Sequence, residues 1–386
     1  MERTNAYSLL DFLDNSPCNF FATATIQRYL DDNGFQELKQ SERWNLEKGG
    51  KYYVKKNDTA IFGFVIGETP LDQSGFNMIS AHSDSPCFRI KPNPEMLADG
   101  VLKLNTEVYG GPILYTWFDR PLSLAGRVIV RNPQNPARPI TRLIDFASPV
   151  LIIPHLAIHF NRNVNAGNPL SKQKDMLPIA AIVSDSMSKN NFLIDQIKER
   201  LEIADSKDIL DFDLMLYNCQ KSQLVGFNKE FICSGRIDDL SMAHAALSAL
   251  LNSDNPATTK VMAIFDNEET GSGTKQGAAS PVLASILHRV STCMGLDDEG
   301  FYQALSRSFL VSADNAHAAH PNYPEKYDPT NHPKMGGGPV IKINANCKYM
   351  TDAHSSAIFK EVCHAANVPY QYFVNHSDVA GGSTLG

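Results

Sequence analysis

The sequence lacks paired cysteines, a long apolar run and an excess of positive charge. Its seven cysteines are scattered along the chain and are never spaced as C-x-x-C. This argues against a disulfide framework and a cysteine-based zinc ribbon, and it favours a reducing compartment. The formal net charge is −7, which disfavours non-specific binding to nucleic acid or anionic lipid. We therefore expect small or peptidic partners and no nucleic acid.

The distribution of apolar residues also lacks the features of a secretory signal and of a membrane span. Charged residues such as Glu2, Arg3 and Asp11 interrupt the apolar residues near the N-terminus, where a signal would need an unbroken apolar core. The longest apolar stretch, residues 150–160, contains Pro154 and is far shorter than the roughly 20 residues needed to cross a bilayer. We expect a cytoplasmic protein that does not bind membranes.

The length and the periodicity predict an α/β protein. A chain of 386 residues, 43% of them hydrophobic, is long enough for two or three domains of about 150 residues. Apolar residues at helical spacing predict helices over residues 20–32, 191–202, 240–251, 282–294 and 354–367. Short β-rich runs predict strands over residues 52–54, 60–66, 76–80, 261–265, 309–312, 340–344 and 370–374. Strands that alternate with helices are typical of α/β layers.

Residues 91–231 have a different character from the rest of the chain. Pro and Gly are frequent there, and short strand-like runs such as residues 126–131 lie between them. This pattern predicts a β-rich insert. It would divide one catalytic domain into residues 1–90 and residues 232–386.

The sharpest chemical signal follows the strand predicted over residues 261–265. The sequence continues as Asp266-Asn267-Glu268-Glu269, which places carboxylates at the carboxyl end of a strand, where open α/β sheets bind ligands. Adjacent Glu268 and Glu269 are expected to point in different directions. One would then ligate a metal while the other acts as a base on metal-bound water. A solvated acidic loop explains this feature equally well when it is taken alone.

Three other element ends carry residues able to bind metal. His82 and Asp84 follow a strand. His82 can bind zinc, and Asp84 is suited to orienting the imidazole or another ligand without binding the metal itself. Asp238 opens a helix, and Asp314 ends a strand with His317 close behind it. Taken one at a time, His82 is most simply explained as a structural histidine and Asp238 as a helix N-cap. Together, four such ends predict a carboxylate-rich centre with two metal ions.

The order of these motifs resembles the aspartyl aminopeptidase family of cocatalytic zinc exopeptidases. The resemblance covers nearly the whole chain. It includes segments between the metal motifs, among them Tyr109-Gly110-Gly111 and Gly382-Ser383-Thr384. The motifs that carry it are His82-Ser83-Asp84, Gly235-Arg236-Ile237-Asp238, Asp266-Asn267-Glu268-Glu269 and Ser312-Ala313-Asp314.

The resemblance implies a fold and a ligand set. The fold is a three-layer α/β/α zinc-peptidase catalytic domain with an inserted β-rich dimerisation domain, in a dimer-based and dodecameric homo-oligomer. Asp238 would bridge two zinc ions, His82 and Asp314 would complete one site, and Glu269 would contribute to the other. Glu268 would be the general base. A bridging carboxylate holds two cations close together and partly neutralises their repulsion.

The resemblance also implies a substrate. The family removes an acidic residue, Asp or Glu, from the N-terminus of peptides by attack of metal-bound hydroxide. Lys342 matches the family's lysine after Pro-Val-Ile, and we infer that it binds the substrate, against the simpler interpretation of a strand-end lysine that points to solvent. His159 matches a histidine that reaches the active site of a neighbouring subunit. Asp239 stands where many relatives have Asn, and it is either a surface cap or a perturbation of the bridge.

One departure from the family concerns the second zinc ion. Relatives continue into a further strand and helix whose histidine completes that site, whereas this chain stops at Gly386. His376 does not match that ligand, so either the recorded chain is truncated or the second metal is held weakly. The alternatives are a related two-metal amidohydrolase or dipeptidase, and a catalytically weak assembly subunit. Zinc, cobalt and manganese all tolerate such nitrogen and oxygen ligands.

Overall fold

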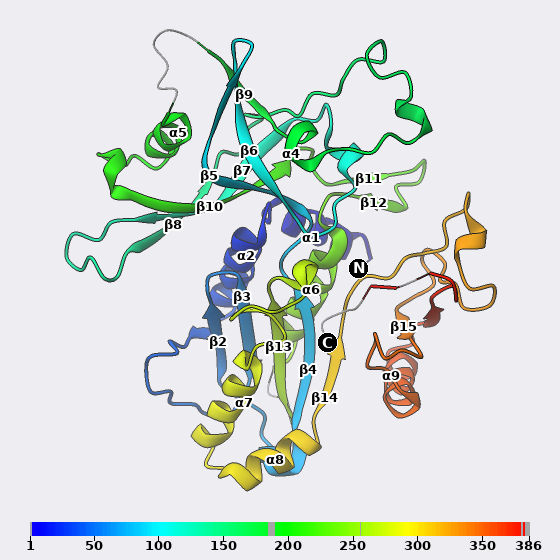
Figure 1. Cartoon of the computed structure of the whole chain (residues 1–386). Helices are drawn as coiled ribbons and strands as arrows, with labels where there is room; N and C mark the ends of the chain where they lie inside the picture. The colour runs from blue at the N-terminus through cyan, green and yellow to red at the C-terminus, as the bar shows by residue number, and fades with distance from the viewer. Residues whose placement is uncertain (1, 184–189, 255, 380, 383–386) are drawn as a thin grey trace.

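The computed structural model describes residues 2–183, 190–254, 256–379 and 381–382. Ser383 and Thr384, which contribute to the resemblance, lie outside the described residues. Two sheets organise the chain, one below the other in Figure 1. No helix among the described residues is long and apolar enough to cross a membrane.

The first sheet has six strands and belongs to the part of the chain that carries the predicted metal motifs. Strands β13, β4 and β14 run parallel to one another, whereas β3 is antiparallel to both β2 and β13. In spatial order the strands are β1 (Gln36–Glu37), β2 (Lys51–Lys56), β3 (Ala60–Val65), β13 (Thr259–Phe265), β4 (Phe76–His82) and β14 (Phe309–Ser312).

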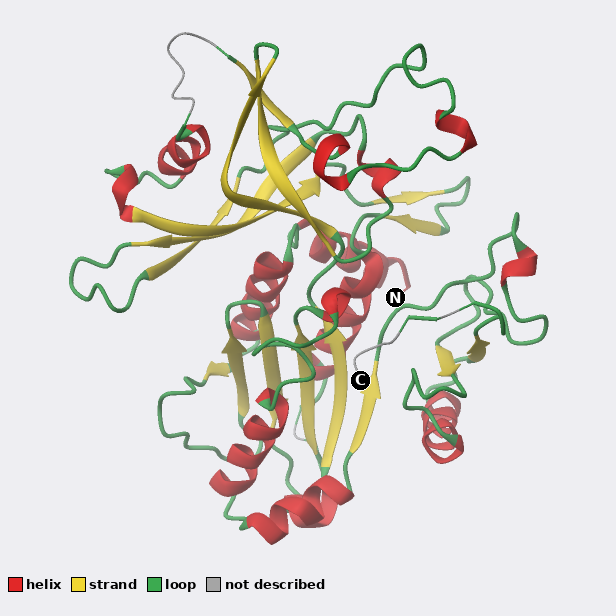
Figure 2. Ribbon diagram, in the orientation of Figure 1, coloured by secondary structure: helices red, strands yellow, loops and turns green. Residues whose placement is uncertain are grey.

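Helices cover both faces of this sheet (Figure 2). One face packs against α1 (Glu2–Asp14), α2 (Asn19–Asp32) and α6 (Ile237–Leu251), and the other against α7 (Val282–Cys293) and α8 (Asp298–Ser306). Alternation along β13 explains the two cores, because successive side chains of a strand point to opposite faces. Val261 and Phe265 lie in the core with α7 and α8, and Met262 and Ile264 lie in the core with α1, α2 and α6. The architecture is the expected three-layer α/β/α fold.

The second sheet is antiparallel and has its own apolar core. Helix α5 (Phe192–Arg200) packs into this core through Leu193 and Ile197. The short helices α3 (Leu71–Ser74) and α4 (Lys172–Asp175) lie in connections. The strands of the sheet, in spatial order, are β8 (Ile140–Asp145), β7 (Leu122–Val130), β10 (Ile209–Asn218), β5 (Cys87–Ala98), β6 (Val101–Tyr109) and β9 (Ile179–Ile182).

Two small strand pairs complete the fold. Strands β11 (Gln223–Val225) and β12 (Phe231–Cys233) are antiparallel and lead back to α6. Strands β15 (Val340–Ile343) and β16 (Gln371–Val374) are parallel and are joined through α9 (Ala353–Ala365). The two main parts meet at a separate apolar cluster in which Cys18 and Phe20 contact Ala125 and Met215.

The predicted helices and strands are all present, with ends that shift by a few residues. Helices α1 and α8 and the long hairpin of β5 and β6 were not predicted. The division into residues 1–90, 91–231 and 232–386 stays a prediction. The chain enters the second sheet at Cys87, because β5 begins there.

Gly126 offers a test of how tightly the second sheet is packed. It lies in β7 opposite Leu214 of β10, and a Cβ atom at Gly126 would collide with the backbone carbonyl oxygen of Asp213. Gly126→Ala should lower the free energy of unfolding by about 1–3 kcal/mol, the usual cost of overpacking. Gly111→Ala is the control, since a Cβ there meets nothing within 4 Å. Equal thermal midpoints for the two variants would contradict this packing.

Candidate metal centre

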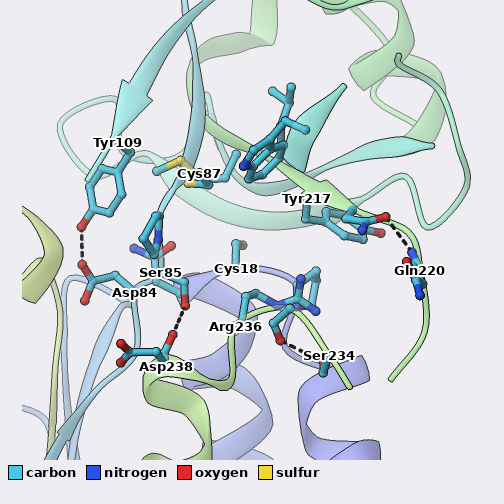
Figure 3. A pocket seen from close by; sticks show the side chains of 18 of the residues that line it. Cys18, Asp84, Ser85, Cys87, Tyr109, Tyr217, Gln220, Ser234, Arg236 and Asp238 are labelled. Atoms are coloured by element: carbon cyan, nitrogen blue, oxygen red, sulfur yellow. Dashed lines mark hydrogen bonds between the residues drawn. The ribbon is translucent and has the colours of Figure 1, made fainter. Parts of the chain in front are cut away.

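A pocket of about 370 Å³ opens between the two main parts of the molecule. Its lining includes Asp84, Tyr109, Arg236 and Asp238 (Figure 3). It lies at the edge of the first sheet where β4 and β13 end. Because β4, β13 and β14 are parallel, their carboxyl ends bring the motifs at residues 82–84, 266–269 and 312–314 to the same edge.

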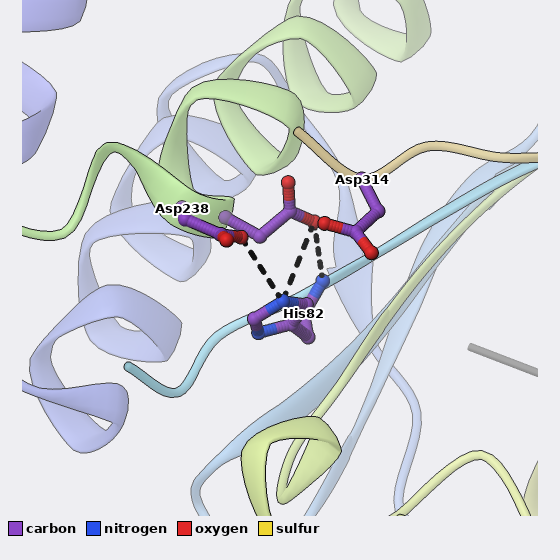
Figure 4. A group of neighbouring side chains, drawn as sticks. His82, Asp238 and Asp314 are labelled. Carbon is purple, nitrogen blue, oxygen red and sulfur yellow. Dashed lines mark hydrogen bonds and ion pairs between the residues drawn. The ribbon is translucent and has the colours of Figure 1, made fainter. Parts of the chain in front are cut away.

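One group of potential ligands surrounds the imidazole of His82. His82, Asp238, Asp239 and Asp314 each offer an atom within 4.8 Å of the others. His82 Nε2 lies 3.5 Å from Asp238 Oδ1 (Figure 4) and, in addition, 4.0 Å from Asp239 Oδ2. Asp238 is the open member, with 54% of its side chain exposed, whereas His82 is 1% exposed. The structure thus brings together the three residues assigned to the first zinc ion.

The other ring nitrogen of His82 is held by Asp84. His82 Nδ1 lies 3.0 Å from the Asp84 carbonyl oxygen and 3.2 Å from Asp84 Oδ1. A proton on Nδ1 satisfies this contact and leaves Nε2 free to bind a metal ion, which is the usual arrangement of a ligating histidine. Burial alone lowers the pKa of His82, but contacts with Asp238 and Asp84 and the charge of Asp239 raise it to about 12.

A second group consists of His82, Glu268 and Glu269, again with one atom of each within 4.8 Å of the others. The two glutamates lie on a short 3₁₀ turn that begins after Asn267, whose φ of 63° is left-handed. Each glutamate offers an oxygen to this group, and the expectation that the two side chains point in different directions stays a prediction. Burial raises the pKa of Glu268 and raises that of Glu269 to about 7.

Asp239 is not a surface cap. Its side chain is fully buried, and its oxygens accept the backbone N–H of His82 at 3.1 Å and the Asn315 amide at 3.2 Å. Burial raises its pKa well above the ordinary value. The first turn of α6 is irregular, because Asp238 and Asp239 have non-helical backbone angles. Among the described residues no helix N–H donates to the Asp238 side chain, which argues against the N-cap interpretation of Asp238.

The donors fit zinc. One imidazole nitrogen and several carboxylate oxygens are ligands that zinc accepts. Burial first, and then the charges of neighbouring carboxylates, raise the pKa of Glu268, Glu269 and Asp314, as expected where buried negative charges gather without enough positive charge nearby. A divalent cation supplies that charge. The two groups share His82, and the bridging role of Asp238 stays a prediction.

Lys342 reaches this edge from β15. Its Nζ donates to the Asn315 carbonyl oxygen at 2.9 Å and lies 3.5 Å from Asp314 Oδ2. Only 14% of the side chain is exposed, so the interpretation of a lysine pointing to solvent is wrong. Lys342 and Asp314 also line a second pocket, of about 520 Å³, between β14 and β15.

Two other histidines lie apart from these groups. His159 is exposed in the connection between β8 and β9, and His376 is partly exposed just after β16. Neither belongs to a potential metal-binding group among the described residues. No role was predicted for Tyr109, whose hydroxyl contacts Asp84 and Asn267. The only available signal was its place in the Tyr109-Gly110-Gly111 segment.

The comparisons with known proteins agree on one family. The family model described as aminopeptidase I zinc metalloprotease (M18) matches residues 12–386. A "probable M18 family aminopeptidase 2" of Clostridium novyi is 52% identical over 382 residues, which cover 99% of this chain and 88% of that protein. A second protein of that description, from Clostridium acetobutylicum, is 50% identical with the same coverage.

Solved structures give the same result. The fold matches a chain of "Cryo-EM structure of the Ape4 and Nbr1 complex" with a TM-score of 0.94 and 36% identity, over 100% of this chain and 77% of that one. It matches "Structure of S. cerevesiae mApe1 dodecamer" with a TM-score of 0.83 and 25% identity, over 95% of this chain and 84% of that one.

Zinc analysis of variants tests the ligand assignment. Asp238→Ala should deplete both zinc ions, because a bridging carboxylate serves two cations, whereas Asp314→Ala should deplete mainly one. The control is Asp298→Ala, which removes an exposed carboxylate 2.9 Å from His288 and should leave the zinc content unchanged. Elemental analysis of the purified proteins gives the stoichiometry. Full occupancy in Asp238→Ala would remove Asp238 from the ligand set.

Proposed function

We propose a substrate class for a chain that belongs to the M18 family of aminopeptidase I zinc metalloproteases and is therefore a zinc-dependent aminopeptidase. The substrates are peptides with an N-terminal Asp or Glu. The observation that carries this specificity is the largely buried ammonium group of Lys342 beside Asp314. A fixed positive charge at the metal centre favours a substrate whose side chain is a carboxylate.

His82, Asp238 and Asp314 would hold one zinc ion, and Asp238 and Glu269 would contribute to the other. Bound zinc supplies Lewis-acid polarisation of the scissile carbonyl and lowers the pKa of water. The residues of the chain orient these ligands and exclude solvent behind them. Asp84 keeps His82 Nε2 facing the carboxylates, and Asp239 fixes the His82 backbone.

Glu268 is the proposed general base. Its Oε2 lies 3.9 Å from His82 Nε2, and 14% of its side chain is exposed, so that a substrate can reach it. The carboxylate would accept a proton from the attacking water at Oε2 and return it to the leaving amine. Burial raises the pKa of Glu268, and a raised pKa brings a carboxylate closer to the range in which it exchanges protons near neutral pH.

Lys342 would bind the acidic side chain of the substrate. Its present partners are the Asn315 carbonyl oxygen and Asp314. The second pocket beside it, lined by Asp314 and Tyr349, offers space for a short side chain. Asp314 would share its negative charge between a bound cation and Lys342, which would leave the ammonium group of Lys342 more available to substrate.

The same proposal includes assembly and location. We expect a homo-oligomer built from dimers. Twelve is the number of subunits to test first, because the structure of one relative is described as a dodecamer. The exposed position of His159 supports a contact made between subunits rather than within one. All seven cysteines are free, which supports a reducing compartment such as the cytoplasm.

Lys342→Ala should flatten the substrate preference. The loss of a charge-assisted contact of about 1.5–3 kcal/mol should raise KM for Glu- and Asp-terminal chromogenic amides far more than for Leu-terminal ones. Lys51→Ala is the control, because Lys51 also contacts an aspartate, at 2.7 Å, but lies away from the centre. An equal loss on all substrates would make Lys342 a structural partner of Asp314 only.

Glu268→Gln and Glu269→Gln should separate base from ligand. Glu268→Gln should keep its zinc and lower kcat at least about a hundredfold, since general-base catalysis contributes about 10²–10⁴. Glu269→Gln should lose zinc. Metal analysis and steady-state kinetics on the same preparations provide both values. Zinc loss in Glu268→Gln, with retention in Glu269→Gln, would mean that the two roles are reversed.

A further inference from the structure

Tyr109 reaches the metal centre from the second sheet. It is the last residue of β6, yet its hydroxyl lies 2.6 Å from Asp84 Oδ2 (Figure 3). The same hydroxyl lies 2.8 Å from the Asn267 side-chain nitrogen. The phenol donates to Asp84 and accepts from Asn267. One hydroxyl group therefore joins the segment after β4 to the segment after β13, from outside the sheet that carries both.

Asp84 is the residue through which this contact can act on the centre. Its Oδ1 accepts the backbone N–H of Glu268 at 3.1 Å, and its Oδ2 accepts that of Glu269 at 3.2 Å. Oδ1 also lies 3.2 Å from His82 Nδ1. The Asp84 side chain is 1% exposed, so no solvent replaces a lost partner. A rotation of the Asp84 side chain would therefore break its contacts with His82, Glu268 and Glu269 together.

Through Asn267, the hydroxyl of Tyr109 makes a second contact with the turn that carries Glu268 and Glu269. The Asn267 side-chain oxygen accepts hydrogen bonds from Thr274 at 2.8 Å and from Gln276 at 2.9 Å, while its nitrogen donates to Tyr109. Asn267 immediately precedes Glu268 and has left-handed backbone geometry. Fixing its side chain therefore fixes the start of the turn that carries both glutamates.

Gly110 adds a contact of a different kind. Its φ is 69°, and a Cβ atom built there would lie 3.0 Å from the Cβ of Glu269 and 3.5 Å from its Oε2. The missing side chain lets the end of β6 lie directly against Glu269. Backbone packing from the second sheet thus limits where this carboxylate can move.

We propose that Tyr109 and Gly110 are positioning residues of the aminopeptidase reaction, which orient His82, Glu268 and Glu269 through Asp84, Asn267 and direct packing. Neither residue touches the reacting atoms. The second sheet therefore helps to fix the geometry of the metal centre, in addition to its part in the overall fold. This inference rests on the aminopeptidase activity and is independent of the preference for acidic substrates.

Tyr109→Phe removes only the hydroxyl oxygen and tests the first contact. Partners that orient metal ligands typically change metal affinity or activity by about 10–100-fold when mutated. We expect kcat to fall about tenfold or more, KM to change less than about threefold, and zinc to be lost more readily to a competing chelator. Tyr53→Phe is the matched control, since its hydroxyl donates to Asp31 at 2.8 Å away from the centre.

Gly110→Ala tests the packing contact independently of the hydroxyl. Its control is Gly100→Ala, which has a similar φ of 80° but meets nothing within 4 Å, so backbone strain is matched and only the contact with Glu269 differs. We expect Gly110→Ala to lower both kcat and zinc affinity, and Gly100→Ala to leave both close to the wild-type values. Thermal midpoints of each pair measure any general loss of stability.

Two results would overturn the proposal. One is a Tyr109→Phe protein with kcat within about twofold of wild type and unchanged zinc affinity. The other is a pair of glycine variants with equal activity and equal zinc affinity, which would reduce the effect to backbone strain. If the wild-type protein hydrolyses no aminoacyl amide, the proposed function fails, and chelator competition on the same variants still decides the positioning role.

Discussion

The crowding of carboxylates around one buried imidazole is the constraint on which the rest of the centre depends. Asp238, Asp239, Asp314, Glu268 and Glu269 all reach the surroundings of His82. Like charges at such distances repel strongly where water is excluded. The chain offsets this with donors placed behind the cluster. Backbone N–H groups bind Asp84 and Asp239, and Lys342 lies against Asp314. Zinc provides the remaining positive charge.

Much of this arrangement could be predicted, because it follows from strand direction. A buried apolar run that ends in polar residues is visible in one dimension, and parallel strands place such ends at one edge. His82, Asp314 and the Glu268–Glu269 pair were found in this way. The predicted helices were also readable, since each has a continuous apolar stripe. Helix α8 and the β5–β6 hairpin were missed because their patterns are short or interrupted by Pro92 and Pro94.

Other features depend on contacts that no local pattern encodes. Asp239 follows Asp238 directly, yet one is buried and the other is half exposed. Both offer an oxygen to the group around His82, and only the surrounding tertiary structure decides which of the two side chains is buried. The contacts of Tyr109 are even harder to predict from the sequence. It ends a strand of the second sheet, and its partners Asp84 and Asn267 belong to separate segments of the first. Sequence spacing carries no signal for such a meeting.

The order of strands in the first sheet has a consequence for synthesis of the chain. Strand β13 lies between β3 and β4, but it is made only after the whole second sheet. A nascent chain therefore carries β3 and β4 with open edges and a missing centre while the insert folds. Pairings of such high contact order form slowly, and unpaired edges invite association with other chains. Completion of the first sheet therefore has to wait until residues 259–265 have been synthesised, after the whole second sheet.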